Sequence, residues 1–232
     1  MKTSFWTRLF DVISPRLCAI CGNRLSVNEQ VLCANCHLHL PLTGYEKTPL
    51  DNELARLFWG QFPVERAAAL FFYEPKSAVS QLIYDMKYRG MSEIGERMGE
   101  ITARRFATEG FFEGIDVLVP MPITRRRQWQ RGYNQSMEIA RGVSSVTGIP
   151  ISRKAVRRIH FTQSQTEQHA WERLHNVENA FLLSKPDDIQ GKHILLIDDI
   201  VTTGATTIAC GRELAKAPDV RISILALGHT KS

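Results

Sequence analysis

Long apolar runs are absent from this sequence of 232 residues. A membrane-spanning helix needs roughly 18 consecutive apolar residues, whereas Arg, Asp or Gly interrupts every hydrophobic segment here before that length is reached. Near the N-terminus, Arg8 and Asp11 break up the hydrophobic residues and no small-residue cleavage site follows, so no secretory signal is expected. The sequence therefore predicts a cytoplasmic protein that does not insert into a membrane.

Repeats, low-complexity tracts and two common nucleotide-binding motifs are also missing. Neither the Gly-rich dinucleotide fingerprint nor the Walker phosphate loop occurs in the chain. Apolar residues make up 44% of the chain and charged residues 23%, which is ordinary for globular proteins and excludes disorder as the main state. The composition predicts one large core with a small appendage.

Cysteine is scarce and unevenly placed. Two Cys-x2-Cys pairs, separated by eleven residues, lie near the N-terminus, and Cys210 stands alone in a predicted helix as a small buried residue. Two such turns supply the four tetrahedral thiolates that a structural Zn²⁺ needs, and a full set leaves no position open for substrate. The predicted zinc ligands are Cys18, Cys21, Cys33 and Cys36.

Other uses of these cysteines remain as alternatives. His37 or His39 lies close enough in sequence to replace one thiolate ligand. Two disulfides would suit a small extracellular module, and a redox pair would suit a thioredoxin-like βαβ unit. Zinc is favoured because the sequence has neither a secretion signal nor that βαβ context around the cysteines.

Positive charge is concentrated in the middle of the chain. The formal net charge is only +5, yet residues 101–160 hold eleven basic side chains against four acidic ones, a local excess of seven. An excess of this kind favours a polyanionic ligand, either phosphate groups or nucleic acid. A solvated basic face is the alternative.

Short apolar runs alternate with helical periods after a turn-rich stretch at residues 41–44 and a linker with Pro49. We expect a cysteine module over 1–50 and a second domain over 51–232. The alternation predicts βαβ units, and hence an α/β fold with an open, mostly parallel sheet and helices on both faces. Ser92 is expected to cap its helix, and a basic loop is expected after residue 120. Strands are predicted at 67–73, 116–120, 156–159, 180–183, 194–197 and 222–227, and helices at 77–88, 92–107, 135–147 and 205–216.

The most informative segment is residues 194–206. Four apolar residues are followed by Asp198 and Asp199 and then by a Thr/Gly-rich turn that opens a helix. The carboxyl ends of parallel strands line the ligand crevice, so both carboxylates are expected to point into it. Backbone amides at a helix N-terminus bind phosphate, and carboxylates beside it suit sugar hydroxyls. An ordinary strand–turn–helix with acidic residues at its edge is the alternative.

This segment resembles the motif with which type I phosphoribosyltransferases bind 5-phosphoribosyl 1-diphosphate (PRPP). Val-Pro-Met-Pro at 119–122 and Arg-Gly-Tyr-Asn-Gln at 131–135 narrow the resemblance to the ComF/GntX family, with Tyr133 where Phe is commoner. Gln-Ser-Gln at 163–165 and Lys-Tyr-Arg-Gly at 87–90 fit further family patches, whereas Trp171 departs from the pattern. An N-terminal four-cysteine module is also the usual layout of that family.

The resemblance implies a phosphoribosyltransferase-type domain with PRPP as ligand, Mg²⁺ bound together with PRPP, and a defined set of site residues. Asp198 and Asp199 would be the catalytic pair that holds the ribose hydroxyls. A polar segment near residues 162–176 suits a mobile lid that carries Gln165, Arg173 and Asn176. The 5-phosphate residues would be Thr202, Thr203, Gly204, Ala205 and Thr206, and the diphosphate residues Arg125, Arg126, Arg127, Arg131 and Gly132.

Two functions follow from the resemblance. The first is a PRPP-binding protein of DNA uptake in natural transformation, which handles single-stranded DNA and has a DNA-processing helicase as a partner. The alternative is an active phosphoribosyltransferase of nucleotide salvage, in which a nitrogen acceptor displaces diphosphate from PRPP. No segment specifies that acceptor. Aromatic residues among the arginines favour stacking of bases, and four cations stand apart from the predicted diphosphate loop. The aromatic residues are Trp129, Tyr133, Phe161 and Trp171, and the four cations are Arg153, Lys154, Arg157 and Arg158.

Overall fold

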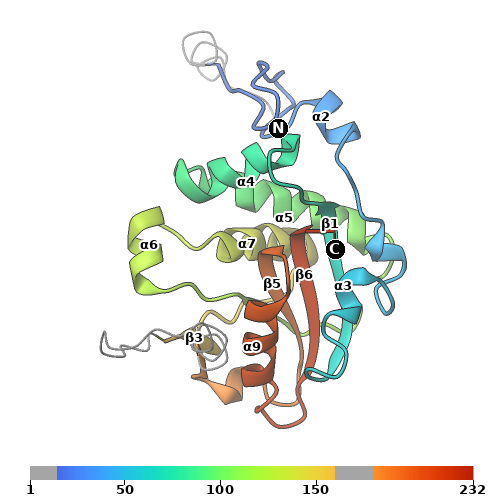
Figure 1. Cartoon of the computed structure of the whole chain (residues 1–232), viewed down its shortest axis with the longest axis vertical. Coiled ribbons are helices and arrows are strands. Elements are labelled where there is room, and N and C mark those ends of the chain that lie inside the picture. The colour runs from blue at the N-terminus through green and yellow to red at the C-terminus, as the bar shows by residue number, and fades with distance from the viewer. Residues whose placement is uncertain (1–14, 160–179, 232) are drawn as a thin grey trace.

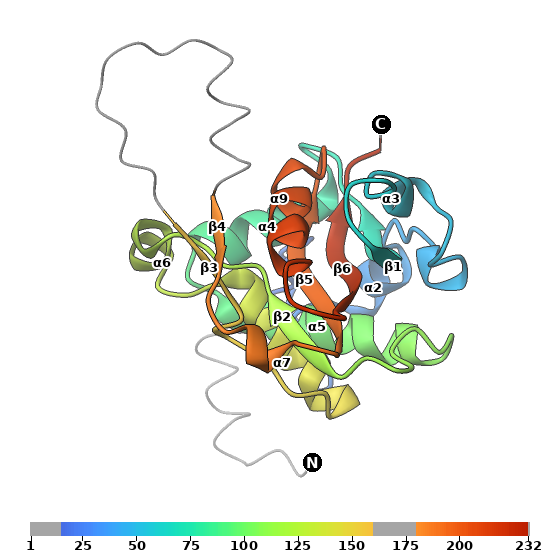
Figure 2. The same cartoon turned by 90° about the horizontal axis from the view of Figure 1, so that it is seen from below.

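The computed structural model describes residues 15–159 and 180–231 and has a four-stranded parallel sheet at its centre. The strand order is β1-β6-β5-β2, and each neighbouring pair runs parallel (Figure 1 and Figure 2). The expected open, mostly parallel α/β sheet is therefore confirmed. The strands are β1 (Val64–Phe72), β2 (Val117–Pro120), β5 (His193–Val201) and β6 (Arg221–His229).

Helices cover both faces of this sheet, as predicted. Helices α5 and α7 pack against each other on one face, and α9 lies on the opposite face (Figure 2). The longer helices are α4 (Ala78–Tyr88), α5 (Ser92–Ala107), α7 (Gln135–Thr147) and α9 (Ala205–Leu214). The shorter ones are α2 (Ala34–Leu38), α3 (Glu53–Arg56) and α6 (Arg125–Arg131), with 3₁₀ turns η1 (Tyr45–Lys47) and η2 (Pro186–Asp188).

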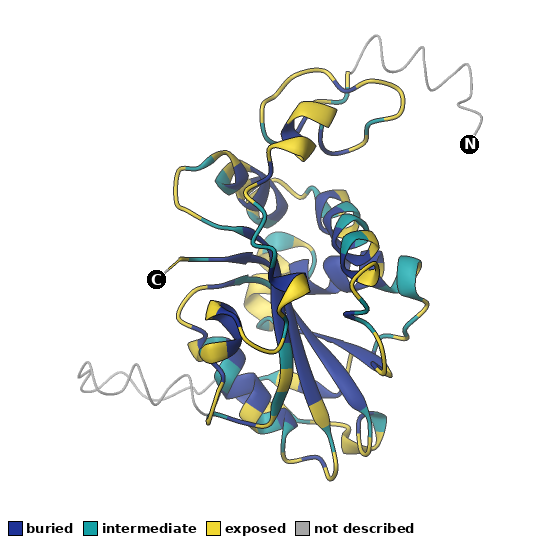
Figure 3. Ribbon diagram, turned by 90° about the vertical axis from the view of Figure 1, so that its right-hand side faces the viewer, coloured by how far each residue is buried: buried dark blue, intermediate teal, exposed yellow. Residues whose placement is uncertain are grey.

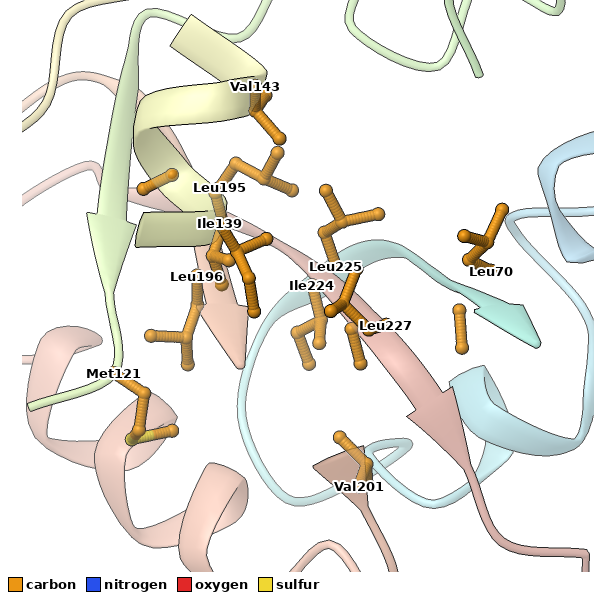
Figure 4. Close-up of a cluster of buried hydrophobic side chains, with 14 of the residues drawn as sticks. Leu70, Met121, Ile139, Val143, Leu195, Leu196, Val201, Ile224, Leu225 and Leu227 are labelled. Carbon is orange, nitrogen blue, oxygen red and sulfur yellow. The ribbon is translucent and has the colours of Figure 1, made fainter. Parts of the chain in front are cut away.

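The core lies between the sheet and these helices. Strands β5 and β6 are almost wholly buried, because helices shield both faces of a parallel sheet (Figure 3). Ile139 and Val143 of α7 belong to the same cluster as Leu195 and Leu225 of the strands (Figure 4). In the described part of the chain, no helix is both long and apolar enough to cross a membrane.

Two glycines allow α5 and α7 to approach closely. A Cβ atom on Gly142 would lie 1.9 Å from the carbonyl oxygen of Glu96, and one on Gly99 would lie 2.2 Å from that of Ile139. No larger residue fits there without separation of the two backbones. This contact fixes α7, whose first turn carries residues of the candidate site.

Strand β5 is longer than predicted and contains both aspartates. Its pairing with β6 continues through Asp198, opposite Ala226, to Val201, opposite His229. The predicted strand ends at Ile197, but pairing with β6 continues past both aspartates, although aspartate is disfavoured in strands. Both carboxylates are consequently held by a paired backbone.

Three other local expectations need correction. The basic stretch is not a loop: Arg125–Arg131 form α6, and the Thr124 side chain caps that helix by accepting a bond from Arg127 N. Ser92 is not a cap, because Met91 occupies the N-cap position and Ser92 is already the first helical residue. The strands β3 (Val156–Arg158) and β4 (Phe181–Leu183) form a separate antiparallel pair beside the main sheet.

The segment after the cysteines lies along the free edge of β1. Leu42 forms an antiparallel bridge with Phe71, and Thr43 N donates to the carbonyl of Leu70. Apolar residues from the cysteine segment, such as Leu25 and Leu32, belong to the same continuous core cluster as the sheet. The boundary between domains near residue 50 stays a prediction.

Candidate functional site

A cavity of about 240 Å³ lies where β5 ends and α9 begins. All seven residues predicted for the acidic pair and the phosphate loop line it, together with two of the predicted diphosphate residues, Arg127 and Arg131. Five polar residues that the sequence did not single out for the site also line it. These five are Lys87 from α4, Gln135 and Ser136 from α7, Arg158 from β3, and Thr207 from α9.

Asp198 is buried and held by the surrounding scaffold. Its Oδ1 accepts bonds from Asp199 N (2.9 Å) and from Ser136 Oγ (3.4 Å), and its Oδ2 accepts a bond from Thr207 Oγ1 (3.5 Å). Burial, followed by repulsion from the Asp199 carboxylate, raises the pKa of Asp198 to about 7. Protein groups therefore already occupy both oxygens of this carboxylate.

Asp199 has a different environment. Its Oδ2 lies 3.0 Å from Nζ of Lys87, and its Oδ1 accepts a bond from Ile200 N. Lys87 sits in the last turn of α4, a helix that precedes β5 by a long stretch of sequence. The lysine could not be found by motif spacing, although it lies in the Lys-Tyr-Arg-Gly patch.

The loop from Thr202 to Thr206 leads into the N-terminus of α9. Gly204 is the N-cap, with φ of +75°, and a Cβ atom there would meet the Phe58 ring at 3.3 Å. Glycine is required because few other residues adopt this left-handed conformation. The first-turn amides of a helix have no partners within the helix, and they attract anions. The N-terminus of α9 therefore lies at the wall of the cavity.

The five predicted diphosphate residues separate in space. Arg127 and Arg131 line the loop cavity, whereas Arg125 and Gly132 line a second, larger depression. Arg126 is exposed and lines neither of the two. Arg131 donates to Gln135 Oε1 and lies over the Tyr88 ring, 5.4 Å from its centroid. The helical geometry of α6 explains the separation, since successive residues face different sides.

The second depression, called the arginine groove below, has a volume of about 1090 Å³. It shares Ile123, Arg131 and Arg158 with the loop cavity, so the two are adjacent. Its lining acid is Glu138, which is paired with Arg141 at 2.6 Å. Six arginines line this groove: Arg125, Arg131, Arg141, Arg153, Arg157 and Arg158.

Arg158 stands where the cavity and the groove meet. Burial, and then the nearby charge of Arg127, lower the pKa of Arg158 from its usual value. Its guanidinium lies over the Phe181 ring at 5.3 Å from the centroid. Among the described residues, neither Arg127 nor Arg158 forms an ion pair with a carboxylate. Two close cations without a paired carboxylate suit an anionic ligand.

Of the other residues predicted to contact DNA or to form a lid, some line the groove and some do not. Lys154 is exposed and does not line the groove, although Arg153 and Arg157 do. Trp129 is 87% exposed on α6, whereas Tyr133 lines the groove and donates its hydroxyl to the Met86 carbonyl. The predicted lid residues Gln165, Arg173 and Asn176, and the aromatics Phe161 and Trp171, lie outside the described residues.

The four N-terminal cysteines form one cluster. Their sulfur atoms lie within 4.8 Å of one another, and the Sγ atoms of Cys21 and Cys33 are 3.7 Å apart. Zn–S bonds of about 2.3 Å in a tetrahedron give sulfur–sulfur distances of about 3.8 Å. The described cysteines are free thiols, so the disulfide alternative is not what the structure contains. The cluster could hold a metal ion, and its four-thiol donor set is consistent with zinc.

The remaining thiol and the two histidines have other positions. Cys210 is fully buried on α9, as predicted. His37 and His39 are not among the clustered ligand atoms, and His39 Nδ1 instead lies 2.8 Å from the carbonyl of Asn35. The donor set is therefore four cysteines, without a histidine substitute.

Comparisons with known proteins give relatives along most of the chain, although no protein-family model matches it. The chain is 28% identical over 222 residues to the DNA utilization protein YhgH of Escherichia coli K12, which covers 92% of this chain and 90% of that protein. It is 26% identical to competence protein F of Haemophilus influenzae (91% and 84% covered). With competence protein ComFC of Bacillus subtilis the identity is 24% (90% and 76% covered).

Solved structures give more distant similarities. Glutamine PRPP amidotransferase from B. subtilis has a TM-score of 0.38 and 20% identity, over 56% of this chain and 25% of that chain. Adenine phosphoribosyltransferase from Leishmania tarentolae has a TM-score of 0.38 and 14% identity, over 77% of this chain and 88% of that chain. The curated relatives, together with the four-cysteine cluster, confirm the predicted resemblance to the ComF family of competence and DNA utilization proteins.

Proposed function

We propose that the chain binds PRPP in the cavity between β5 and α9 and takes part in the use or uptake of DNA. The observation that carries the proposal is the composition of the cavity wall. One small cavity combines an acidic pair, a glycine-capped helix N-terminus and several cations. A sugar that carries a phosphate at one end and a diphosphate at the other requires these three features together.

Each part of the ligand has a matching part of the cavity. The helix N-terminus at Gly204 takes the 5-phosphate, and the Asp199 carboxylate faces the ribose hydroxyls. Arg127, Arg131 and Arg158 take the diphosphate, because guanidinium groups bind phosphate oxygens in pairs. Mg²⁺, when bound with PRPP, neutralises charge on the diphosphate.

The chemistry open to such a site is transfer of the phosphoribosyl group. A nitrogen nucleophile attacks C1 of the ribose, the bond from C1 to the diphosphate oxygen breaks, and diphosphate leaves with the electron pair. The chain's arginines stabilise the charge that develops on the leaving group. Release of diphosphate from PRPP in the presence of a pool of nucleobases would establish this enzymatic version of the proposal, and its absence would leave a binding protein.

Titration calorimetry with PRPP and MgCl₂ tests the ligand. We expect saturable binding by the wild-type chain. An absence of heat and saturation would overturn the assignment of the cavity. Thr230→Ala is the control variant, because Thr230 bonds to the end of β5 but does not line the cavity. It should bind PRPP as the wild-type chain does.

A second function, contact with single-stranded DNA, is favoured by the arginine groove. Six arginines and one already paired acid make the groove predominantly positive, and a diphosphate needs only some of these charges. The DNA-related names of the curated relatives support this proposal, and a DNA-processing helicase is a proposed partner on the same grounds. Binding of a labelled oligonucleotide should weaken steeply with salt, because phosphate contacts release counterions.

For the cysteine cluster, we propose a structural Zn²⁺ held within a separate module over residues 1–50. Free thiols of this kind persist in a reducing compartment, which agrees with a cytoplasmic location. Metal analysis of the purified protein should give about one zinc per chain, the stoichiometry of one tetrathiolate site. Replacement of Cys36 by Ser should lower that ratio and destabilise the module.

A further inference from the structure

The ion pair between Lys87 and Asp199 lies inside the candidate ligand cavity. The two atoms, Nζ and Oδ2, are 3.0 Å apart, and the side chains are only 21% and 15% exposed. Partial shielding from water strengthens such a pair compared with one on the surface. Lys87 therefore occupies one oxygen of the Asp199 carboxylate inside the cavity.

The groups that hold the two aspartates differ in mobility. Asp198 accepts bonds from a backbone amide and from two short hydroxyl side chains, all on packed elements. Oδ2 of Asp199, by contrast, is held by the tip of a lysine, whose ammonium group sits on a flexible four-carbon stem. Of the two carboxylates, Asp199 can exchange its partner with little rearrangement of the fold.

Other cations at the cavity are engaged differently. Arg131 is positioned by Gln135 and by the Tyr88 ring, and Arg158 lies over Phe181. Neither arginine forms an ion pair with an acid among the described residues, whereas Lys87 does. Lys87 is thus the cavity cation whose charge must be released from a carboxylate before it can act on a ligand.

We propose that Lys87 is an exchangeable counter-ion for ligand binding, an inference that rests on the proposed PRPP function. Ligand hydroxyls replace Nζ on Oδ2 of Asp199, and the released ammonium group moves to the diphosphate oxygens. Both charged groups keep a partner throughout, which avoids the cost of an unpaired charge in a shielded site. A ligand that has hydroxyls but no diphosphate frees Lys87 without giving it a new partner.

Three ligands separate these steps by calorimetry: PRPP, ribose 5-phosphate and inorganic diphosphate. In Lys87→Met, PRPP and diphosphate should bind roughly tenfold more weakly, because one charge-assisted contact is lost. Ribose 5-phosphate should bind as tightly as before or more tightly, because nothing competes with it for Asp199. Lys216→Met removes a lysine from another ion pair, with Glu213 on the surface, and should change none of the three affinities.

Asp199→Asn provides the reciprocal variant if Lys87→Met does not fold. It keeps the shape of the side chain but releases Lys87, so diphosphate should bind at least as well while ribose 5-phosphate binds more weakly. Equal weakening of all three ligands in Lys87→Met, or no change in any, would overturn the counter-ion role while leaving PRPP binding intact. If the wild-type chain bound neither sugar phosphate, the proposed function would fall, and this inference with it.

Discussion

The loop cavity and the arginine groove share three residues but differ in the charges that line them. The cavity combines Asp198 and Asp199 with cations, whereas the acid in the groove is already paired with Arg141. A site with both signs of charge can bind hydroxyls and phosphates in one small molecule. A site with one effective sign binds a chain of phosphates with little regard to what joins them. Substitutions that weaken binding at the cavity or at the groove alone test whether these are two different sites.

The largest effect is expected from Asp199→Ala. Loss of the carboxylate removes the acceptor for the ribose hydroxyls, and two charge-assisted bonds correspond to roughly a hundredfold loss of PRPP affinity. Single-stranded DNA should bind with unchanged affinity, because Asp199 does not line the groove. Calorimetry for PRPP and fluorescence anisotropy for DNA measure the two. A parallel loss of both affinities would show that cavity and groove are one site.

The next largest effect should come from the double variant Arg153→Ala and Arg157→Ala. Both residues line the groove and neither lines the cavity. DNA affinity should fall about tenfold. The slope of log affinity against log salt concentration should decrease by the amount expected for about two phosphate contacts. PRPP affinity should remain the same. Lys154→Ala is the matched control, because Lys154 is exposed next to them but outside the groove. Equal losses in the control and in the double variant would point to a diffuse basic surface.

Arg158→Ala should affect both ligands by a smaller factor. Arg158 lines both depressions, so PRPP and DNA should each lose roughly three- to tenfold in affinity, as for one charged contact. Because the contact is shared, PRPP should also reduce DNA binding in a competition titration of the wild-type chain. Independent binding of the two ligands would contradict a common residue at the junction.

The smallest effect concerns pH. Burial raises the pKa of Asp198 to about 7, above its value in an unfolded chain, so the folded state binds the proton more tightly. The contribution to stability is full below the unfolded pKa and is lost as the pH rises through 7. The free energy of unfolding in urea should therefore fall between pH 5 and pH 8. Asp198→Asn should make the free energy of unfolding less dependent on pH in this range. An unchanged dependence would show that another group titrates there.

Much of the fold followed from patterns along the chain. Helices α5 and α7 begin and end where the hydrophobic period predicts, and apolar runs mark β1, β5 and β6. The prediction failed where tertiary contacts or local capping outweighed the pattern. Pairing with β6 extends β5 across two aspartates, and the Thr124 cap turns a basic stretch into α6.

The residues of the candidate site likewise fall into those that the sequence predicted and those that only the structure brought together. The segment from Asp198 to Thr206 was readable because its residues are adjacent and each has a distinct chemistry. Lys87 and Arg158 could not be assigned to it, since an isolated cation in a helix or strand has the same pattern as a solvated surface residue. Arg126 illustrates the reverse, because it follows Arg125 and precedes Arg127 in the sequence but does not line the cavity, and its diphosphate role stays a prediction.

The sequence by itself determined the parallel α/β class, the cysteine spacing and the acidic Thr/Gly loop, since these depend on local order and periodicity. Only the tertiary structure decided which distant cations meet that loop. The packing of α4 and the position of the β3–β4 pair bring Lys87 and Arg158 to the aspartates. Such contacts arise from how whole elements pack, through surfaces whose charge has no periodic signature in the sequence.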